Sequence, residues 1–215
     1  MEVIIMAQRP YFYVSDLYVS RRIAEFEWFA GFAVSQQQKS IASFHSELRS
    51  MGFNPLEVST KSTDALGRKL SAFNLELDGH KIECIYQSSK VFRNGGPYTD
   101  LLEKSPKDAK RDERLRTSGE LTKYSYRGED WSLIPKTLFY DFIYYEAVRQ
   151  SLTQEELEQL MEYDAFTDIA FNPNKSLNTQ ARSVAVVAFV YSRFGSLPAF
   201  GRDEFLEIHR KIVIA

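Results

Sequence analysis

The sequence predicts an α+β fold that is predominantly helical, in which a small sheet packs with amphipathic helices in a single domain. Three observations support this class. The chain has 215 residues of which 44% are hydrophobic, enough for one sizeable core. Apolar residues recur at helical intervals in most segments, and short stretches of alternating apolar and polar residues lie between them. Such elements must bury their apolar faces against one another.

Six segments have the apolar periodicity or charge pattern of helices. The first begins at Ser35–Gln38, which has capping-box spacing, and ends at Gly52. A later segment alternates charges of both signs, as exposed helices with salt bridges do. Another begins at Trp131 and has an aromatic face, with Pro135 in its first turn, where a missing N–H is tolerated. The predicted helices span residues 35–52, 81–93, 103–116, 131–145, 155–161 and 180–194.

Two segments, 56–60 and 73–77, are predicted to be strands. In the second, apolar residues alternate with Asn74 and Glu76 before an Asp78–Gly79 turn. Residues 163–178 form a polar stretch rich in Asp and Asn between two apolar elements, which predicts a long loop. Loops of this length inside a compact domain are usually functional.

Composition excludes several classes of function. A net charge of −2 and a pI near 6.0 argue against a protein that holds nucleic acid by bulk charge. The single cysteine, Cys84, permits no intramolecular disulfide and suits a reducing compartment. No signal-peptide pattern and no run of about 18 apolar residues occurs, so we expect a cytoplasmic protein without a membrane span.

The sequence contains no histidine pattern or nucleophile motif that indicates a metal or cofactor site. His45, His80 and His209 are far apart and lack Cys or carboxylate neighbours at metal-ligand spacing. No GxSxG, P-loop or GxGxxG motif occurs. We therefore expect neither a metal nor a cofactor, and the remaining chemistry is that of carboxylates and lysines.

Glu83, Gln87 and Lys90 form a polar stripe on the predicted helix of residues 81–93. At about 100° per residue, the three side chains fall within roughly 60° of one another. The stripe follows Ser71 and Asn74 closely, so two consecutive elements can present polar groups to one pocket. Such a row is either the solvated face of an amphipathic helix or a carboxylate–amide–ammonium site.

A resemblance to a known family favours the second interpretation. An ordered series of short motifs resembles the NADAR family over about residues 70–190, although Cys84 replaces the family's His and Ala72 its Asn. Other motifs resemble the branch of that family found beside DarT-type ADP-ribosyltransferase toxins. The family series is Ser71-Ala72-Phe73-Asn74, Glu83 with Gln87 and Lys90-Val91-Phe92, Ser105-Pro106 with Ala109 and Arg111, Trp131, and Asp164-Ala165-Phe166 with Asp168 and Asn178. The branch motifs are 31–35, 96–100, 110–115 and 171–173.

The resemblance implies an ADP-ribosyl glycohydrolase that removes ADP-ribose from guanine in nucleic acid. Such an enzyme reverses a DarT-type toxin, as an antitoxin or a counter-defence enzyme. It implies a NADAR-like fold with a catalytic core over residues 70–215, and an N-terminal segment, residues 1–69, that packs on this core. The expected partners are ADP-ribosylated nucleic acid or ADP-ribose, and a DarT-type toxin.

Hydrolysis of an N-glycosidic bond assigns roles to these residues. Positive charge develops at the anomeric carbon, so a carboxylate must stabilise it or activate water. Glu83 is our choice, and Asp168 is a second candidate. Lys90 either holds a hydroxyl or phosphate oxygen or acts as a nucleophile, and both roles stay open. Substrate-binding roles fall to Phe166 and Trp131 by stacking, to Arg111 by pairing with pyrophosphate, and to Ser71, Asn74, Gln87 and Asn178 as polar contacts.

Two other functions remain open at this stage. One is an N-glycosidase that acts on a small molecule such as a riboflavin-pathway intermediate. The other is a non-catalytic antitoxin that blocks its toxin by contact. Turnover with substoichiometric protein separates this binding protein from both enzymes.

Overall fold

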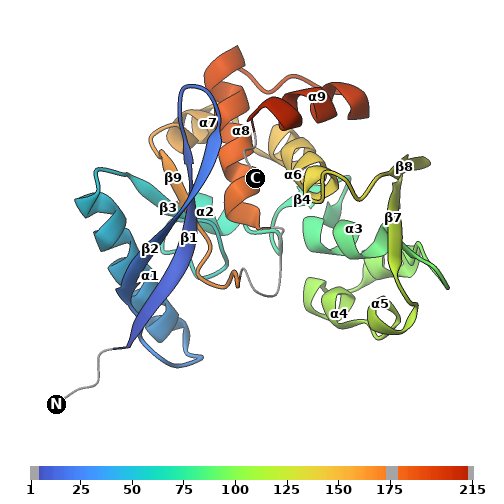
Figure 1. The fold of residues 1–215 in the computed structure, drawn as a ribbon, viewed down its shortest axis with the longest axis horizontal. Coiled ribbons are helices and arrows are strands. Elements are labelled where there is room, and N and C mark those ends of the chain that lie inside the picture. Colours follow the sequence, from blue (N-terminus) through green and yellow to red (C-terminus); the bar gives the residue numbers. More distant parts are fainter. Residues whose placement is uncertain (1–4, 173–178, 213–215) are drawn as a thin grey trace. The chain divides into compact units, whose positions relative to one another are not determined.

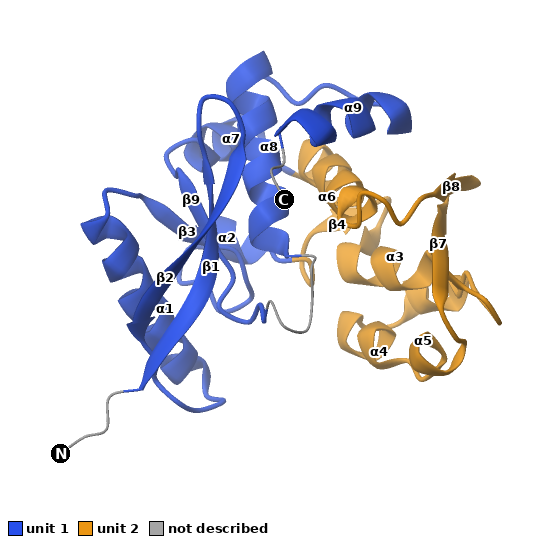
Figure 2. Cartoon of the chain, in the orientation of Figure 1, with its two compact units in different colours: residues 1–71, 152–215 blue, residues 72–151 orange. Residues whose placement is uncertain are grey.

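The computed structural model describes residues 5–172 and 179–212 (Figure 1). Asn178, one of the predicted substrate-binding residues, lies outside the described residues. The chain divides into two compact units (Figure 2). Unit 1 combines residues 1–71 with 152–215, and unit 2 consists of residues 72–151. The predicted division into residues 1–69 and 70–215 stays a prediction.

Unit 1 is built on a four-stranded sheet with the order β2-β1-β9-β3. Strands β1 (Met6–Val14) and β2 (Val19–Glu27) form a long antiparallel hairpin. The short strand β9 (Ala165–Thr167) pairs antiparallel with β1 and parallel with β3 (Pro55–Glu57). Residues more than 100 positions apart in the sequence therefore meet in the middle of the sheet.

Helices of unit 1 bury their apolar sides against this sheet. Helix α1 packs on β2, and α8 packs on β1 and β9. Phe26 of β2 stacks on Phe44 of α1, with ring centroids 4.5 Å apart. Burial of such aromatic side chains dominates core energetics. The helices are α1 (Val34–Ser50), α2 (Ala65–Lys69), α7 (Gln154–Leu160), α8 (Gln180–Phe194) and α9 (Arg202–Ile212).

Unit 2 contains a two-stranded and a three-stranded sheet with short helices. Strands β4 and β5 pair across the Asp78–Gly79 turn, and β6, β7 and β8 form the second sheet in that order. Helix α3 packs against α4 and α6. The elements are β4 (Glu76–Leu77), β5 (His80–Lys81), α3 (Ile82–Ser88), β6 (Lys90–Phe92), the 3-10 helix η1 (Thr99–Glu103), α4 (Pro106–Arg111), α5 (Arg114–Thr117), β7 (Leu121–Tyr126), β8 (Glu129–Trp131) and α6 (Leu138–Ser151).

The predicted α+β class, with helices predominating over small sheets, is confirmed. The predicted helices at 155–161 and 180–194 are confirmed as α7 and α8, and Gly195 ends α8 in the left-handed conformation at φ 65°. The Asp78–Gly79 turn is also present, with φ 54° and 80°. Among the described residues, no helix is both long and apolar enough to span a membrane.

The predicted helix over residues 81–93 is wrong in its second half. Helix α3 ends at Ser88, and Lys90 already belongs to β6. The Ser89 carbonyl accepts a hydrogen bond from Ser125 N at 2.7 Å, and Lys90 pairs with Tyr124 of β7. The strand ladder therefore replaces the next helical turn, because the backbone groups that would continue the helix have partners in β7.

The predicted helix starting at Trp131 is also wrong at its beginning. Trp131 ends strand β8, where it pairs with Tyr124, and α6 begins only at Leu138. Pro135 lies before the helix, where its carbonyl accepts from Leu138 N. Proline lacks the N–H that a ladder needs, so the sheet ends ahead of it.

Five smaller predictions also need correction. The strand at 73–77 is reduced to β4, because residues 73 and 74 lie in a turn, and that at 56–60 to β3. The charged helix at 103–116 is divided into η1, α4 and α5. Helix α1 begins after Ala33, which has no side-chain cap, instead of at the predicted capping box. The predicted loop at 163–178 contains β9, and its residues 173–178 lie outside the described residues.

A buried polar chain joins α1 to the sheet of unit 1. Thr167 Oγ1 lies 2.8 Å from His45 Nε2 and donates to Glu57 Oε2 at 2.7 Å. Glu57 Oε1 accepts from Ile169 N at 2.9 Å. Burial raises the pKa of Glu57 and, together with the nearby Arg49, lowers the pKa of His45 to about 3. The imidazole is therefore neutral in the folded protein near pH 7.

His45 should make the protein less stable in mild acid. The unfolded chain binds a proton at His45 below about pH 6.5, whereas the folded chain does so only near pH 3, so stability present above pH 6.5 is lost as pH falls. Compared with His45→Gln, the unchanged protein should lose about 2 kcal/mol more unfolding free energy between pH 7 and pH 5. Urea unfolding at both pH values measures this difference, and equal losses in the two proteins would contradict it.

Candidate functional site

Glu83 and Gln87 meet on helix α3 as the sequence predicted. They are four residues apart, which places them on one face of the helix. Gln87 Nε2 donates to Glu83 Oε1 at 2.8 Å, and Glu83 is only 5% exposed. A buried carboxylate needs partners of this kind, because an unpaired buried charge is costly.

Lys90 completes the stripe from strand β6 instead of from the helix. Its Nζ donates to Gln87 Oε1 at 2.7 Å and lies 4.6 Å from the centroid of the Tyr86 ring. Burial lowers the pKa of Lys90 to about 8; Glu83 opposes this shift, and Lys110 adds to it. Gln87 thus connects a buried carboxylate to a lysine that is partly a neutral amine near pH 8.

A second lysine, Lys110 of α4, reaches the same carboxylate. Its Nζ lies 3.5 Å from Glu83 Oε1, while 59% of its side chain is exposed. Ala109, its neighbour, is buried in a cluster with Cys84 of α3 and Leu101, and this packing holds α4 against α3. Lys110 was not among the predicted site residues, because its spacing indicated only an exposed charged helix and no local pattern reports the contact with α3.

Arg111, the predicted pyrophosphate ligand, is the last residue of α4 and is exposed. Its carbonyl accepts from the Arg116 guanidinium at 3.3 Å. With Lys107 it occupies the side of α4 opposite the buried Ala109, whereas Lys110 lies about 100° from Ala109, given 100° per residue. Within the described ranges, Arg111 and Lys107 have no carboxylate partner, so this face carries uncompensated positive charge.

Three further predicted residues lie at or next to unit 2. Ser71 is buried and ends unit 1 in the sequence, and its N–H donates to Arg68 O at 3.2 Å. Asn74 is exposed in the turn before β4, where its carbonyl accepts from Lys81 Nζ at 2.9 Å. Trp131 is buried against Phe142, with centroids 4.4 Å apart, and no other described residue forms a hydrogen bond with its Nε1.

The other predicted residues belong to unit 1. Phe166 is 0% exposed in the middle of the sheet, so its ring is enclosed by protein atoms. Asp168 directly follows β9; it is buried, and its Oδ1 accepts from Ala170 N at 3.1 Å. Their predicted contacts with substrate stay predictions.

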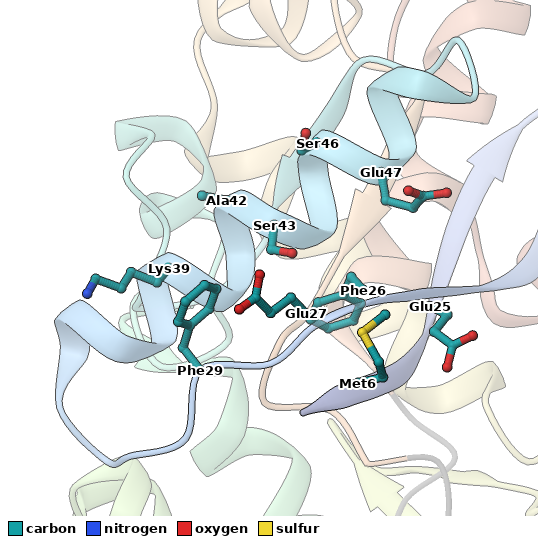
Figure 3. A pocket seen from close by; sticks show the side chains of 10 residues that line it. All are labelled: Met6, Glu25, Phe26, Glu27, Phe29, Lys39, Ala42, Ser43, Ser46 and Glu47. Atoms are coloured by element: carbon teal, nitrogen blue, oxygen red, sulfur yellow. The ribbon is translucent and has the colours of Figure 1, made fainter. Parts of the chain in front are cut away.

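An open hollow of about 560 Å³ also lies in unit 1, between strand β2 and helix α1 (Figure 3). Carboxylates of Glu25, Glu27 and Glu47 line it together with Lys39 and Phe29. None of the predicted site residues lines this hollow. Its acidic side chains do not suit a substrate that carries phosphates.

The arrangement in unit 2 that can catalyse cleavage of a glycosidic bond is the α3 cluster, which consists of Glu83, Gln87, Lys90 and Lys110. It places a carboxylate beside two ammonium groups, and one of these has a lowered pKa. A carboxylate can stabilise a developing oxocarbenium ion, and an amine of lowered pKa can act as nucleophile or base. Among the residues described, no group of three His, Cys, Asp or Glu side chains has the arrangement of a metal site.

Comparison with known families identifies the group of proteins to which this chain belongs. The family model described as "DarT1-associated NADAR antitoxin" matches residues 7–213, and it therefore spans both units. The chain belongs to this NADAR family. The resemblance drawn from the short motifs is thus confirmed, and so is the NADAR-like α+β fold. A search of curated proteins found no match.

Membership of this family defines the general biological role of the NADAR protein. As a member of a family of DarT1-associated antitoxins, it pairs functionally with a DarT-type toxin and antagonises it. The motif residues Glu83, Gln87 and Lys90 are the part of the NADAR resemblance that unit 2 brings into one hydrogen-bonded chain.

Proposed function

We propose that this protein is an ADP-ribosyl glycohydrolase that hydrolyses the N-glycosidic bond between ADP-ribose and guanine in nucleic acid. By this reaction it reverses the damage caused by a DarT-type toxin. The observation that carries the proposal is the hydrogen-bonded chain from Glu83 through Gln87 to Lys90, with both carboxylate and amide buried. A buried charged chain of this kind is costly to maintain, and such clusters concentrate at functional sites.

Glu83 supplies the negative charge that the reaction needs. As the bond to guanine breaks, positive charge develops at the anomeric carbon, and a nearby carboxylate lowers the energy of that state. Gln87 donates to the Glu83 oxygen at 2.8 Å and fixes its position. Asp168, in unit 1, stays the second proposed carboxylate.

Lys90 acts as a neutral amine in the proposed mechanism. Its pKa of about 8 leaves about a quarter of the molecules deprotonated at pH 7.5. The amine lone pair forms a bond to the anomeric carbon as the carbon–guanine bond breaks, and the electron pair stays on the base, which takes up the proton that the alkylated amine loses. Water then adds to the anomeric carbon, the bond from this carbon to the Lys90 nitrogen breaks, and ADP-ribose leaves with the amine restored. Gln87 Oε1 accepts from the attacking nitrogen and orients it.

Positive charge on α4 suits the phosphates of this substrate. Lys107 and Arg111 have no carboxylate partner in the described part of the chain, and they share a face of α4 next to Lys110, which contacts Glu83. Arg111 pairs with the pyrophosphate of ADP-ribose in this proposal, because a guanidinium binds phosphate oxygens in a bidentate manner.

The decisive experiment is incubation of the pure protein with an oligonucleotide that carries ADP-ribosylated guanine. Free ADP-ribose should accumulate in amounts well above that of the protein. Release from a small ADP-ribose-free N-glycoside, but not from the oligonucleotide, would favour the small-molecule N-glycosidase. Tight binding of toxin without any release would favour the non-catalytic antitoxin, whose interface would bury about 800 Å² per partner.

A further inference from the structure

An enzyme that removes a guanine needs a flat surface for the base beside its catalytic carboxylate. Aromatic rings supply such surfaces, because every base has a π-face. The rings chosen from the sequence are enclosed in this structure: Phe166 lies within the sheet of unit 1, and Trp131 packs against Phe139 and Phe142. The Tyr86 ring has Lys90, Tyr124 and Tyr140 as its neighbours.

Phe73 differs from all of these, because it is exposed and lies in a turn that is hydrogen-bonded to the first turn of α3. It is 37% exposed. The carbonyls on either side of it are held by the helix: Glu83 N donates to Ala72 O at 3.1 Å, and Ile82 N donates to Leu75 O at 3.1 Å. These bonds satisfy N–H groups of the first helical turn and fix the turn that carries the ring. The turn that carries Phe73 is thus joined to the backbone of Glu83 through the Ala72 carbonyl.

One ammonium group links the Phe73 ring to the Glu83 carboxylate. Lys110 Nζ lies 5.6 Å from the centroid of Phe73 and 3.5 Å from Glu83 Oε1. Both contacts involve a lysine that is largely exposed, and exposed cation–π contacts and ion pairs are weak. A purine that stacks on an aromatic ring gains more than such a lysine does, so it can displace the Lys110 side chain.

We propose that Phe73 is the surface on which the guanine of the substrate stacks, with the Lys110 side chain displaced from the ring when substrate binds. This inference rests on the proposed glycohydrolase function. Stacking on Phe73 places the guanine beside Glu83, so the bond to be broken faces the carboxylate. Phe73 thereby determines the specificity for a flat base as leaving group.

The test compares Phe73→Ala and Phe73→Trp with the unchanged protein. Removal of the ring should raise KM for the ADP-ribosylated oligonucleotide about 10- to 100-fold, and guanosine should inhibit the alanine variant correspondingly less. Inhibition by ADP-ribose should change little, because ADP-ribose lacks the guanine that is proposed to stack on Phe73. Tryptophan should restore KM and guanosine inhibition, which a purely structural role for phenylalanine would not allow.

The matched control is Phe32 of unit 1, which is 100% exposed. Phe32→Ala should leave KM and guanosine inhibition unchanged. An active unchanged protein whose Phe73→Ala variant keeps its KM and its guanosine inhibition would overturn the stacking role. An unchanged protein that releases no ADP-ribose would instead overturn the proposed function, so the two failures are distinguishable.

Discussion

Replacing Glu83 by glutamine should reduce turnover of the ADP-ribosylated oligonucleotide about 100-fold or more. Glutamine keeps the size of the side chain and an oxygen that can accept the 2.8 Å hydrogen bond from Gln87, but it removes the negative charge. The substitution therefore destabilises the transition state, where positive charge develops, more than it weakens substrate binding. Steady-state kinetics should show the change in kcat, with the thermal midpoint barely moved.

A second consequence of this change concerns Lys90. Glu83 opposes the lowering of the Lys90 pKa, so its removal should lower that pKa further below about 8. The residual activity of Glu83→Gln should then reach its plateau at lower pH than that of the unchanged protein. Glu146→Gln is the matched control, because Glu146 is also a buried carboxylate of unit 2, paired with Arg149. Equal turnover of Glu83→Gln and the unchanged protein would remove Glu83 from the mechanism.

Replacing Lys90 by arginine should abolish activity as fully as Lys90→Ala, by about 100-fold or more. Arginine keeps a positive charge but cannot supply a neutral amine at accessible pH. In the unchanged protein, kcat/KM should rise as pH increases toward about 8 and level off above it, because lysine loses its proton as pH passes its pKa. Initial rates between pH 6 and pH 9.5 measure this profile.

The opposite results would assign Lys90 the other role that the sequence left open. Substantial activity in Lys90→Arg, with a rate that falls above pH 8, would mean that an ammonium group holds a substrate oxygen. Lys123→Arg is the control, since Lys123 lies on the neighbouring strand β7 and pairs with Asp130. Protection of toxin-expressing cells gives an independent readout: full protection by folded Glu83→Gln and Lys90→Ala would favour the binding antitoxin.

Prediction from the sequence was most successful where interactions are local. Glu83 and Gln87 share one helical turn, so their hydrogen bond follows from helical geometry. Lys90 was placed beside Gln87 correctly but for the wrong reason, since α3 ends at Ser88. Whether the chain continues the helix or begins a strand after Ser88 depends on β7. The β7 partners, Tyr124 and Ser125, lie more than 30 residues further along the chain.

The sheet of unit 1 was missed for a related reason. Strand β9 has three residues inside a segment rich in Asp and Asn, too short to show an alternating pattern. Its pairing with β1 and β3 joins segments that are far apart in the sequence, and only the folded backbone shows that they meet. The predicted polar loop therefore contains the buried Phe166.

By itself the sequence determined the α+β class, the family and the order of the carboxylate, amide and lysine along α3 and β6, because short-range periodicity and motif spacing encode these features. Only the tertiary structure decided which groups surround the Glu83 carboxylate. Lys110 reaches it because Ala109 and Cys84 pack α4 against α3, and hydrogen bonds from the first turn of α3 fix the turn that carries Phe73. Contacts of this kind depend on packing between elements, which no local pattern in the sequence reports.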